Sequence, residues 1–272
     1  RVRRVAQGRG GQRRRGYQRR QDHRGDPRRQ RAGRRELVLV AERRHLLPSG
    51  GWIDLAPYLK RDKIDVNIFP AASRYYTQYK GKRCALPLLA DVRGLYYNKK
   101  LFREAGLTRP PKTFAELTTY AKKLTKKNPD GSLKVVGFNP FIGFYQNAVT
   151  ALVPLFGAKW VDSKGNSSLA TDPAWAKMLR WQKSLVDFYG HKNLVKFNAG
   201  AGQEFSASHA FETGKLAMMI DGEWRVAFIH AEHPELQYGT APAPVDPAHP
   251  ELYGGGYVNG TIIGIPKGGH NV

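Results

Sequence analysis

Cysteine is nearly absent from this sequence, which holds only Cys84 among 272 residues. No intrachain disulfide can form, and the strand-like surroundings of Cys84 favour a buried structural thiol over a reactive thiolate. The chain also lacks a long apolar run. The longest, Ala148 to Ala158, is too short to cross a membrane and is interrupted by Pro154, so the sequence predicts no transmembrane helix.

Lysine is missing from the first part of the chain. Residues 1–50 contain 17 Arg, no Lys and four acidic residues, whereas the remainder contains 20 Lys and 8 Arg. The formal net charge of +23 is typical of polyanion binding. However, residues 1–35 show no apolar period of either kind, and only residues 37–40 have the pattern of a strand. Two compositional regimes therefore meet near Ser49-Gly50.

Residues 1–49 have two interpretations. The first is an aberrant or disordered segment, in which CG-rich coding DNA translated out of frame supplies many Arg codons and no hydrophobic period. The second is a genuine basic arm that binds nucleic acid. The chain begins with Arg1 and its first residues lack a signal-peptide-like apolar segment, so we expect the native start and signal sequence to be missing.

Catalytic and metal-binding motifs are also lacking. There is no GxSxG elbow, no P-loop and no GxGxxG that opens a helix after a strand. His230 and His233 share a helical face but lack the HExxH order and a third ligand. Asp91, Asp221 and Glu223 do not form a matched carboxylate pair of the glycosidase kind. We expect no enzyme, no metal and no cofactor.

From Gly51 onward the sequence has the punctuation of a globular protein. Thr113 and Glu116 form a capping box that begins a helix reaching Leu124. Asp172-Pro173 begins a second helix, which ends at Gly190. Short apolar segments alternate with such helices and predict an α/β architecture with largely parallel sheets. These strand-length segments are Ala85–Leu89, Gly94–Tyr97, Val135–Phe138, Leu216–Ile220 and Thr261–Ile265.

Four stretches carry a family resemblance: GWIDLAPYLK (51–60), YKGKRCALPLLADVRGLYYNKKLFREAGLTRPPKTFAEL (79–117), FETGKLAMMIDGEW (211–224) and GGGYVNGTIIGIPKG (254–268). Together they resemble the extracellular solute-binding proteins of ABC importers. The resemblance is to the carbohydrate-binding branch, which includes maltose-binding protein. It extends from about Gly50 to the end of the chain.

The resemblance implies a two-lobed periplasmic-binding-protein-like (type II) fold, truncated at both ends relative to the family. Residues 50–97 would form a partial lobe I, 98–253 lobe II, and 254–272 the return crossing to lobe I. The hinge is expected at Tyr97 and Asn98 on the outward crossing. On the return it is expected at Gly254, Gly255 and Gly256, where glycine gives backbone freedom.

Sugar recognition needs flat aromatic faces and polar groups for hydroxyls. By resemblance, Trp224 is the aromatic platform of lobe II, with a core tryptophan at a helix start as the alternative. Asp91 would reach the solute from lobe I, unless it is only a turn former. Phe144 and Tyr145 are candidates for a second platform, and one of them is expected in the core.

Three further residues complete the candidate ligand-binding set: Arg93, Glu223 and Tyr257. Arg93 has the chemistry to hydrogen-bond a hydroxyl or an acidic sugar, and a surface salt bridge is its alternative role. Glu223 precedes Trp224, and Tyr257 lies on the return crossing.

The resulting hypothesis is a monomeric, extracytoplasmic receptor, periplasmic or lipid-anchored. It would hold a mono- or oligosaccharide between its lobes and deliver it to the membrane permease of an ABC importer. No nucleic-acid partner is expected. Two alternatives stay open: a nucleic-acid-binding protein that uses the basic arm, and a carbohydrate-active enzyme.

Overall fold

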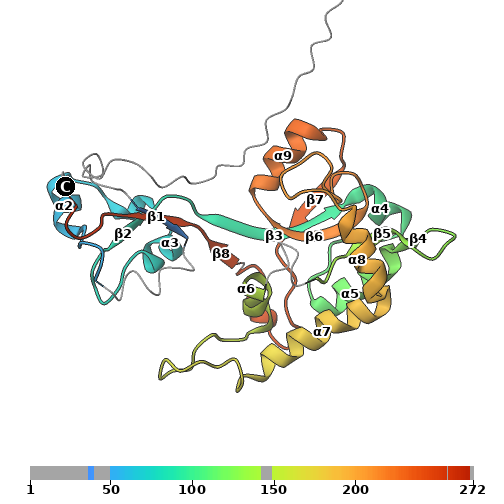
Figure 1. Ribbon diagram of the computed structural model, residues 1–272, viewed down its shortest axis with the longest axis horizontal. Helices are drawn as coiled ribbons and strands as arrows, with labels where there is room; N and C mark the ends of the chain where they lie inside the picture. Colours follow the sequence, from blue (N-terminus) through green and yellow to red (C-terminus); the bar gives the residue numbers. More distant parts are fainter. Residues whose placement is uncertain (1–35, 40–49, 142–148, 256, 270–272) are drawn as a thin grey trace, which may run out of the picture.

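The computed structural model describes residues 36–39, 50–141, 149–255 and 257–269. Of residues 1–49, only 36–39 are described, so the two interpretations of this segment concern residues that lie almost entirely outside the described ranges. Phe144, Tyr145 and Gly256 also lie outside them. The described residues form two groups of elements, each built around its own sheet, and one long strand joins the groups (Figure 1).

Lobe I contains a three-stranded antiparallel sheet in the order β1 (Glu36–Leu39), β9 (Thr261–Gly264), β2 (Ala85–Pro87). Its short helices are α2 (Ala56–Arg61), η2 (Val66–Ile68) and α3 (Ala71–Tyr76). Trp52, Tyr76, Cys84, Ala85 and Ile262 form its core. Cys84 is buried, as predicted, and burial raises the pKa of its thiol.

Lobe II contains the strands β4 (Lys126–Lys127), β5 (Leu133–Phe138), β6 (Leu216–Gly222), β3 (Asp91–Asn98) and β7 (Tyr238–Ala241), in that order; β8 (Tyr257–Asn259) pairs with β3. The prediction of largely parallel sheets is wrong. Among the described strand pairs only β5 and β6 are parallel. The physical reason is that β3 enters from lobe I and runs opposite to β6 through the middle of the sheet.

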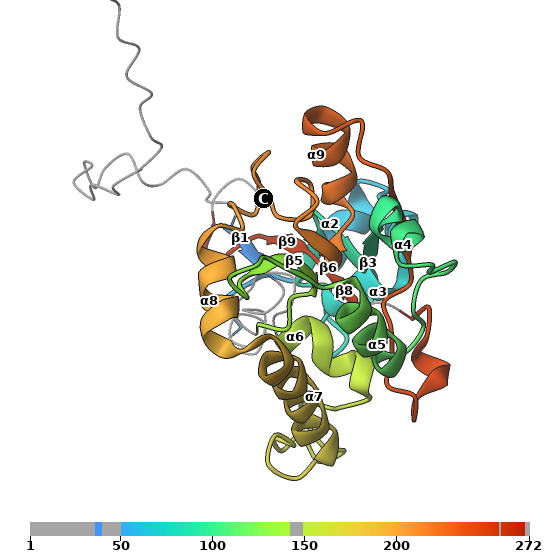
Figure 2. The same ribbon diagram turned by 90° about the vertical axis from the view of Figure 1, so that its right-hand side faces the viewer.

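The helices of lobe II cover both faces of its sheet, with α5 and α7 on one face and α9 on the other (Figures 1 and 2). These and the remaining helical elements are α4 (Lys99–Glu104), α5 (Phe114–Leu124), α6 (Val149–Leu152), η4 (Val153–Phe156), α7 (Pro173–Tyr189), α8 (His191–Ala199), α9 (Trp224–Glu232) and η5 (Pro250–Leu252). The largest apolar core of the described residues lies between these helices and the sheet.

Both helices predicted from caps are confirmed. The Thr113 side chain accepts from the Glu116 N–H at the start of α5, and the Asp172 side chain accepts from the Ala174 N–H at the start of α7. Gly190 ends α7 with a φ of 80°, which favours glycine. Local capping chemistry therefore fixes these two helix boundaries.

The outward crossing between the lobes lies at the start of β3. Asp91, Val92 and Arg93 pair with the return strand β8, whereas Tyr97 pairs with Met218 of β6 and Gly239 of β7. Tyr97 and Asn98, which we expected at the hinge, therefore lie inside the lobe II sheet.

Asn98 has a different local role. Its side chain accepts from the Leu101 N–H at 3.0 Å and so caps the following helix, α4.

Candidate functional site

Three strands meet where the chain passes between the lobes. Arg93 of β3 lies opposite Gly222, the last residue of β6, and also opposite Tyr257, the first residue of β8. The carboxyl end of β6 therefore points toward the crossing, and the residues that follow it are carried to the same place. In open α/β sheets this edge is where ligands bind.

Trp224 is brought to the crossing by a tight turn after β6. It is the first residue of α9 and is half-buried. Its ring lies against the Gly222 backbone, because a Cβ at position 222 would come within 2.2 Å of it. The Arg93 guanidinium carbon lies 5.4 Å from the centre of a Trp224 ring, within cation–π distance. Trp224 is thus held against the crossing strand.

Two carboxylates flank this pair. Glu223 is exposed, and its Oε2 accepts from the Val92 N–H at 2.8 Å, which ties the start of α9 to β3. Asp91 is half-buried. Burial raises the pKa of its carboxyl, the charge of Glu223 raises it further, and Arg93 opposes both effects. The site therefore offers carboxylate acceptors beside an aromatic ring and a guanidinium.

The structure brings together five of the predicted ligand-binding residues: Asp91, Arg93, Glu223, Trp224 and, by its backbone, Tyr257. Arg93 is buried, whereas its alternative role in a surface salt bridge requires an exposed side chain. By contrast, the predicted hinge residues Gly254 and Gly255 lie exposed in a turn after η5, ahead of β8.

Sequence reasoning missed the buried groups beneath the turn that joins β6 to α9 and carries Trp224. The Tyr96 hydroxyl donates to the Gly222 carbonyl at 2.8 Å, and burial raises the pKa of that hydroxyl. Arg225, directly after Trp224, is fully buried among acidic side chains. Asp221 and Arg225 are only four residues apart with opposite charges, and this short separation is the one sequence signal that points to their contact.

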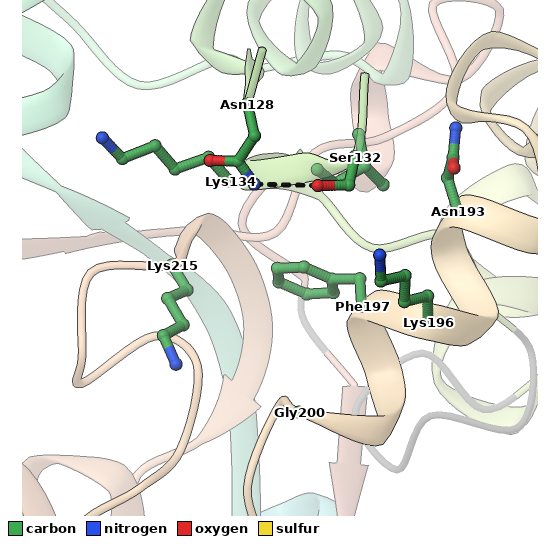
Figure 3. A pocket seen from close by; sticks show the side chains of 9 residues that line it. Asn128, Ser132, Lys134, Asn193, Lys196, Phe197, Gly200 and Lys215 are labelled. Atoms are coloured by element: carbon green, nitrogen blue, oxygen red, sulfur yellow. Dashed lines mark hydrogen bonds between the residues drawn. The ribbon is translucent and has the colours of Figure 1, made fainter. Parts of the chain in front are cut away.

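A hollow of about 340 Å³ lies at the other end of the lobe II sheet (Figure 3). Lys134 near the start of β5 and Lys215 just before β6 line it, so it faces away from the crossing. Figure 3 shows Phe197 at its centre, with Lys196 beside it. Lys196 lies in the last turn of α8, where a cation complements the helix dipole. This hollow is separate from the crossing site.

Within the part of the chain that the structure describes, no helix has both the length and the apolar composition needed to cross a membrane. The prediction from the apolar run concerns residues 148–158, of which only residue 148 lies outside the described ranges.

Known proteins resemble this chain in sequence and in fold. A maltooligosaccharide ABC transporter solute-binding lipoprotein of Streptococcus pneumoniae serotype 4 is 30% identical over 194 residues, covering 66% of this chain and 41% of the relative. The mannitol-binding protein of Pseudomonas aeruginosa is 28% identical over 162 residues, covering 55% and 36%. The chain thus spans less than half the length of these relatives.

The solved structure of CpMnBP1 with mannotriose bound has a TM-score of 0.73 and 38% identity, covering 86% of this chain and 59% of that one. This similarity confirms the two-lobed type II fold. The family model for the bacterial extracellular solute-binding protein matches residues 40–272. The similarity therefore begins about ten residues before Gly50, the start that the sequence motifs predict. The chain therefore belongs to the family of bacterial extracellular solute-binding proteins.

Proposed function

We propose that this protein is a receptor that binds a mono- or oligosaccharide between its lobes and passes it to the permease of an ABC importer. The observation that carries the proposal is the crossing site, where the Trp224 ring lies against Arg93, with Asp91 and Glu223 beside it. A pyranose presents an apolar C–H face and a rim of hydroxyls, and this set of side chains matches both.

The relatives support the choice of ligand class. Their names and titles specify maltooligosaccharide, mannitol and mannotriose, which are saccharides or a polyol. All of these ligands present many hydroxyls and carry no charge. Carboxylates that accept hydrogen bonds from hydroxyls are therefore the expected polar groups of the site.

Each element of the site has a distinct role in the proposed binding. Trp224 stacks on the sugar, the Asp91 carboxylate accepts from hydroxyls, and Arg93 donates to ring or hydroxyl oxygens. Because Asp91 and Arg93 lie on the crossing strand and Trp224 on lobe II, a bound sugar contacts the hinge directly. Such a ligand shifts the open–closed equilibrium by its differential affinity for the closed state.

The proposal includes an extracytoplasmic location, a monomeric state and the absence of catalysis. The family of extracellular binding proteins supports the location and the role as a receptor. The two acidic side chains of the crossing are assigned here to hydrogen bonding. A carbohydrate-active enzyme would instead turn over a glycoside and lose that turnover in Asp91→Asn.

The first experiment is a thermal-shift series with mannotriose, maltotriose and mannitol on the full chain. A ligand that binds only the folded state stabilises it by RT ln(1 + [L]/Kd) and so raises the melting temperature as its concentration increases. We expect at least one saccharide to do so, and Trp224→Ala to abolish the shift. Trp160→Phe, which changes another half-buried tryptophan of lobe II, is the matched control and should keep it. A shift retained in Trp224→Ala would refute the site.

A further inference from the structure

The turn that carries Trp224 is anchored from inside lobe II by one buried guanidinium. Arg225 Nε donates to Asp221 Oδ2 at 2.6 Å, and Nη1 donates to Glu212 Oε1 at 2.6 Å. Nη2 donates to both the carbonyl and the Oε1 of Glu204, each at 2.8 Å. All three nitrogens of the guanidinium therefore have carboxylate partners.

This cluster is largely buried and holds three carboxyl groups for one guanidinium. The side chains of Arg225, Asp221 and Glu212 are completely buried, and that of Glu204 is 17% exposed. Burial and the charge of Arg225 lower the pKa of the nearby His209 to about 3, so that imidazole adds no positive charge at neutral pH. Three carboxyl groups thus share one guanidinium, whose carbon lies 5.8 Å from the Phe228 ring centre.

Stability alone is a poor reason for such a cluster. Desolvation of a buried ion pair offsets most of its attraction, and apolar residues of the same volume stabilise a core as well or better. An arginine with carboxylates on three edges has, however, a single permitted orientation. The cluster therefore fixes the position of the backbone that carries Asp221 and Arg225.

That backbone is the turn with Trp224. Asp221 and Arg225 bracket the residues Gly222 to Trp224, and their contact closes the turn where β6 passes into α9. The Gly222 N–H also donates to Asp221 Oδ1 at 2.8 Å, and its carbonyl accepts from the Tyr96 hydroxyl. The ring of Trp224 then lies on Gly222, so its position is set by the turn beneath it.

We propose that Arg225 is a positioning residue, which holds the Trp224 platform in its ligand-binding orientation through Asp221, Glu212 and Glu204. The inference rests on the proposed sugar-binding function for its biological meaning. The coupling from Arg225 to the Trp224 ring is itself a property of the protein without ligand. It can therefore be tested apart from sugar binding.

The experiment uses the 272-residue chain labelled with 5-fluorotryptophan and observed by ¹⁹F NMR. The Trp224 resonance is identified by its absence in Trp224→Phe. Arg225→Lys keeps one charge but loses the three-edged fork, and Glu204→Gln removes one carboxylate at the partly exposed edge of the cluster. Lys177→Gln is the matched control, because it removes an ion pair to the buried Asp246 of the same lobe, away from the turn.

We expect a shifted or broadened Trp224 resonance in Arg225→Lys and Glu204→Gln, and an unchanged one in Lys177→Gln. For the saccharide that raises the melting temperature, Arg225→Lys should raise Kd about tenfold. In the Trp224→Ala background the same substitution should leave Kd unchanged. An unchanged Trp224 resonance in folded Arg225→Lys would overturn the inference. If Arg225→Lys fails to fold, an unchanged resonance in Glu204→Gln would overturn it equally.

The two readouts separate the inference from the proposed function. If no saccharide binds, the proposed function fails, whereas a perturbed Trp224 resonance still supports the positioning role. If saccharide binds through Trp224 and the resonance is insensitive to both cluster variants, the positioning role fails alone.

Discussion

The guanidinium of Arg93 lies 5.4 Å from the Trp224 ring centre, so the strand that joins the lobes contacts the first residue of a lobe II helix. This contact places a cation against the ring of the proposed sugar platform and holds the ring against the crossing strand. A sugar stacked on Trp224 would therefore lie against a lobe II side chain that is itself in contact with the strand joining the lobes.

Arg93→Gln should weaken saccharide binding, because it removes both the cation–π contact and a charged donor. The expected loss is about 1–2 kcal/mol of binding free energy, or roughly five- to thirtyfold in Kd. Calorimetric titration measures it, with Arg103→Gln as the control on the exposed surface of α4. Equal affinities for Arg93→Gln and wild type would remove Arg93 from the site.

Gly222→Ala should weaken binding by displacing the platform. The new Cβ would come within 2.2 Å of the Trp224 ring, so the ring must move. Gly200→Ala is the matched control, since Gly200 has an ordinary φ of −106° and a new Cβ there meets no atom closer than 3.7 Å. We expect a loss of affinity in the first variant alone, and a wild-type Kd for Gly222→Ala would show that the ring position is unimportant.

Saccharide affinity should fall in acid as Asp91 becomes protonated. Burial and the neighbouring Glu223 raise the pKa of Asp91 above its ordinary value of 3.8, so the carboxylate is lost at a higher pH than in a free side chain. Asp91→Asn should flatten this part of the pH profile, whereas Asp130→Asn, in an exposed turn, should leave it in place. A profile that is identical in wild type and Asp91→Asn would contradict the assignment.

Glu116 should contribute pH-dependent stability. Arg109, above all, and the Lys112 N–H hold the pKa of its carboxyl at about 2, against 4.5 in the unfolded chain. Its contribution is therefore complete above about pH 4.5 and is lost as the pH falls toward 2.

Glu116→Gln should cost about 1–2 kcal/mol at pH 7, discounted because the side chain is 33% exposed. Urea unfolding at pH 7 and pH 3 measures this cost. A cost equal at both values, or larger at pH 3, would contradict the ion pair.

Local sequence chemistry predicts part of this fold well. The caps at Thr113 and Asp172 specify α5 and α7, because a side-chain acceptor at the N-cap acts over only a few residues. Strand direction does not follow from local pattern. The alternation of strands and helices suggested parallel pairing, whereas β3 runs antiparallel to β6 because it comes from the other lobe.

The candidate site was predictable to a similar degree. Resemblance predicts Trp224 in the lobe II wall and Asp91 at the lobe I edge, and the structure brings both beside Arg93. Resemblance also predicts a hinge at Tyr97 and Asn98, whereas these residues pair with a lobe II strand. The burial of Arg225 was not predictable from periodicity, because a charged residue in a helix is ordinarily a surface residue. Only the assembled sheet shows that three acidic side chains surround it.

The most direct test of the receptor proposal is a calorimetric titration of the wild-type protein and Trp224→Ala with the saccharide that gives the largest thermal shift. We predict saturable one-to-one binding to the wild type, and a loss of affinity on the order of a hundredfold in Trp224→Ala. Equal affinity of the two proteins would contradict the account. So would a wild-type protein that gives no heat of binding with any saccharide.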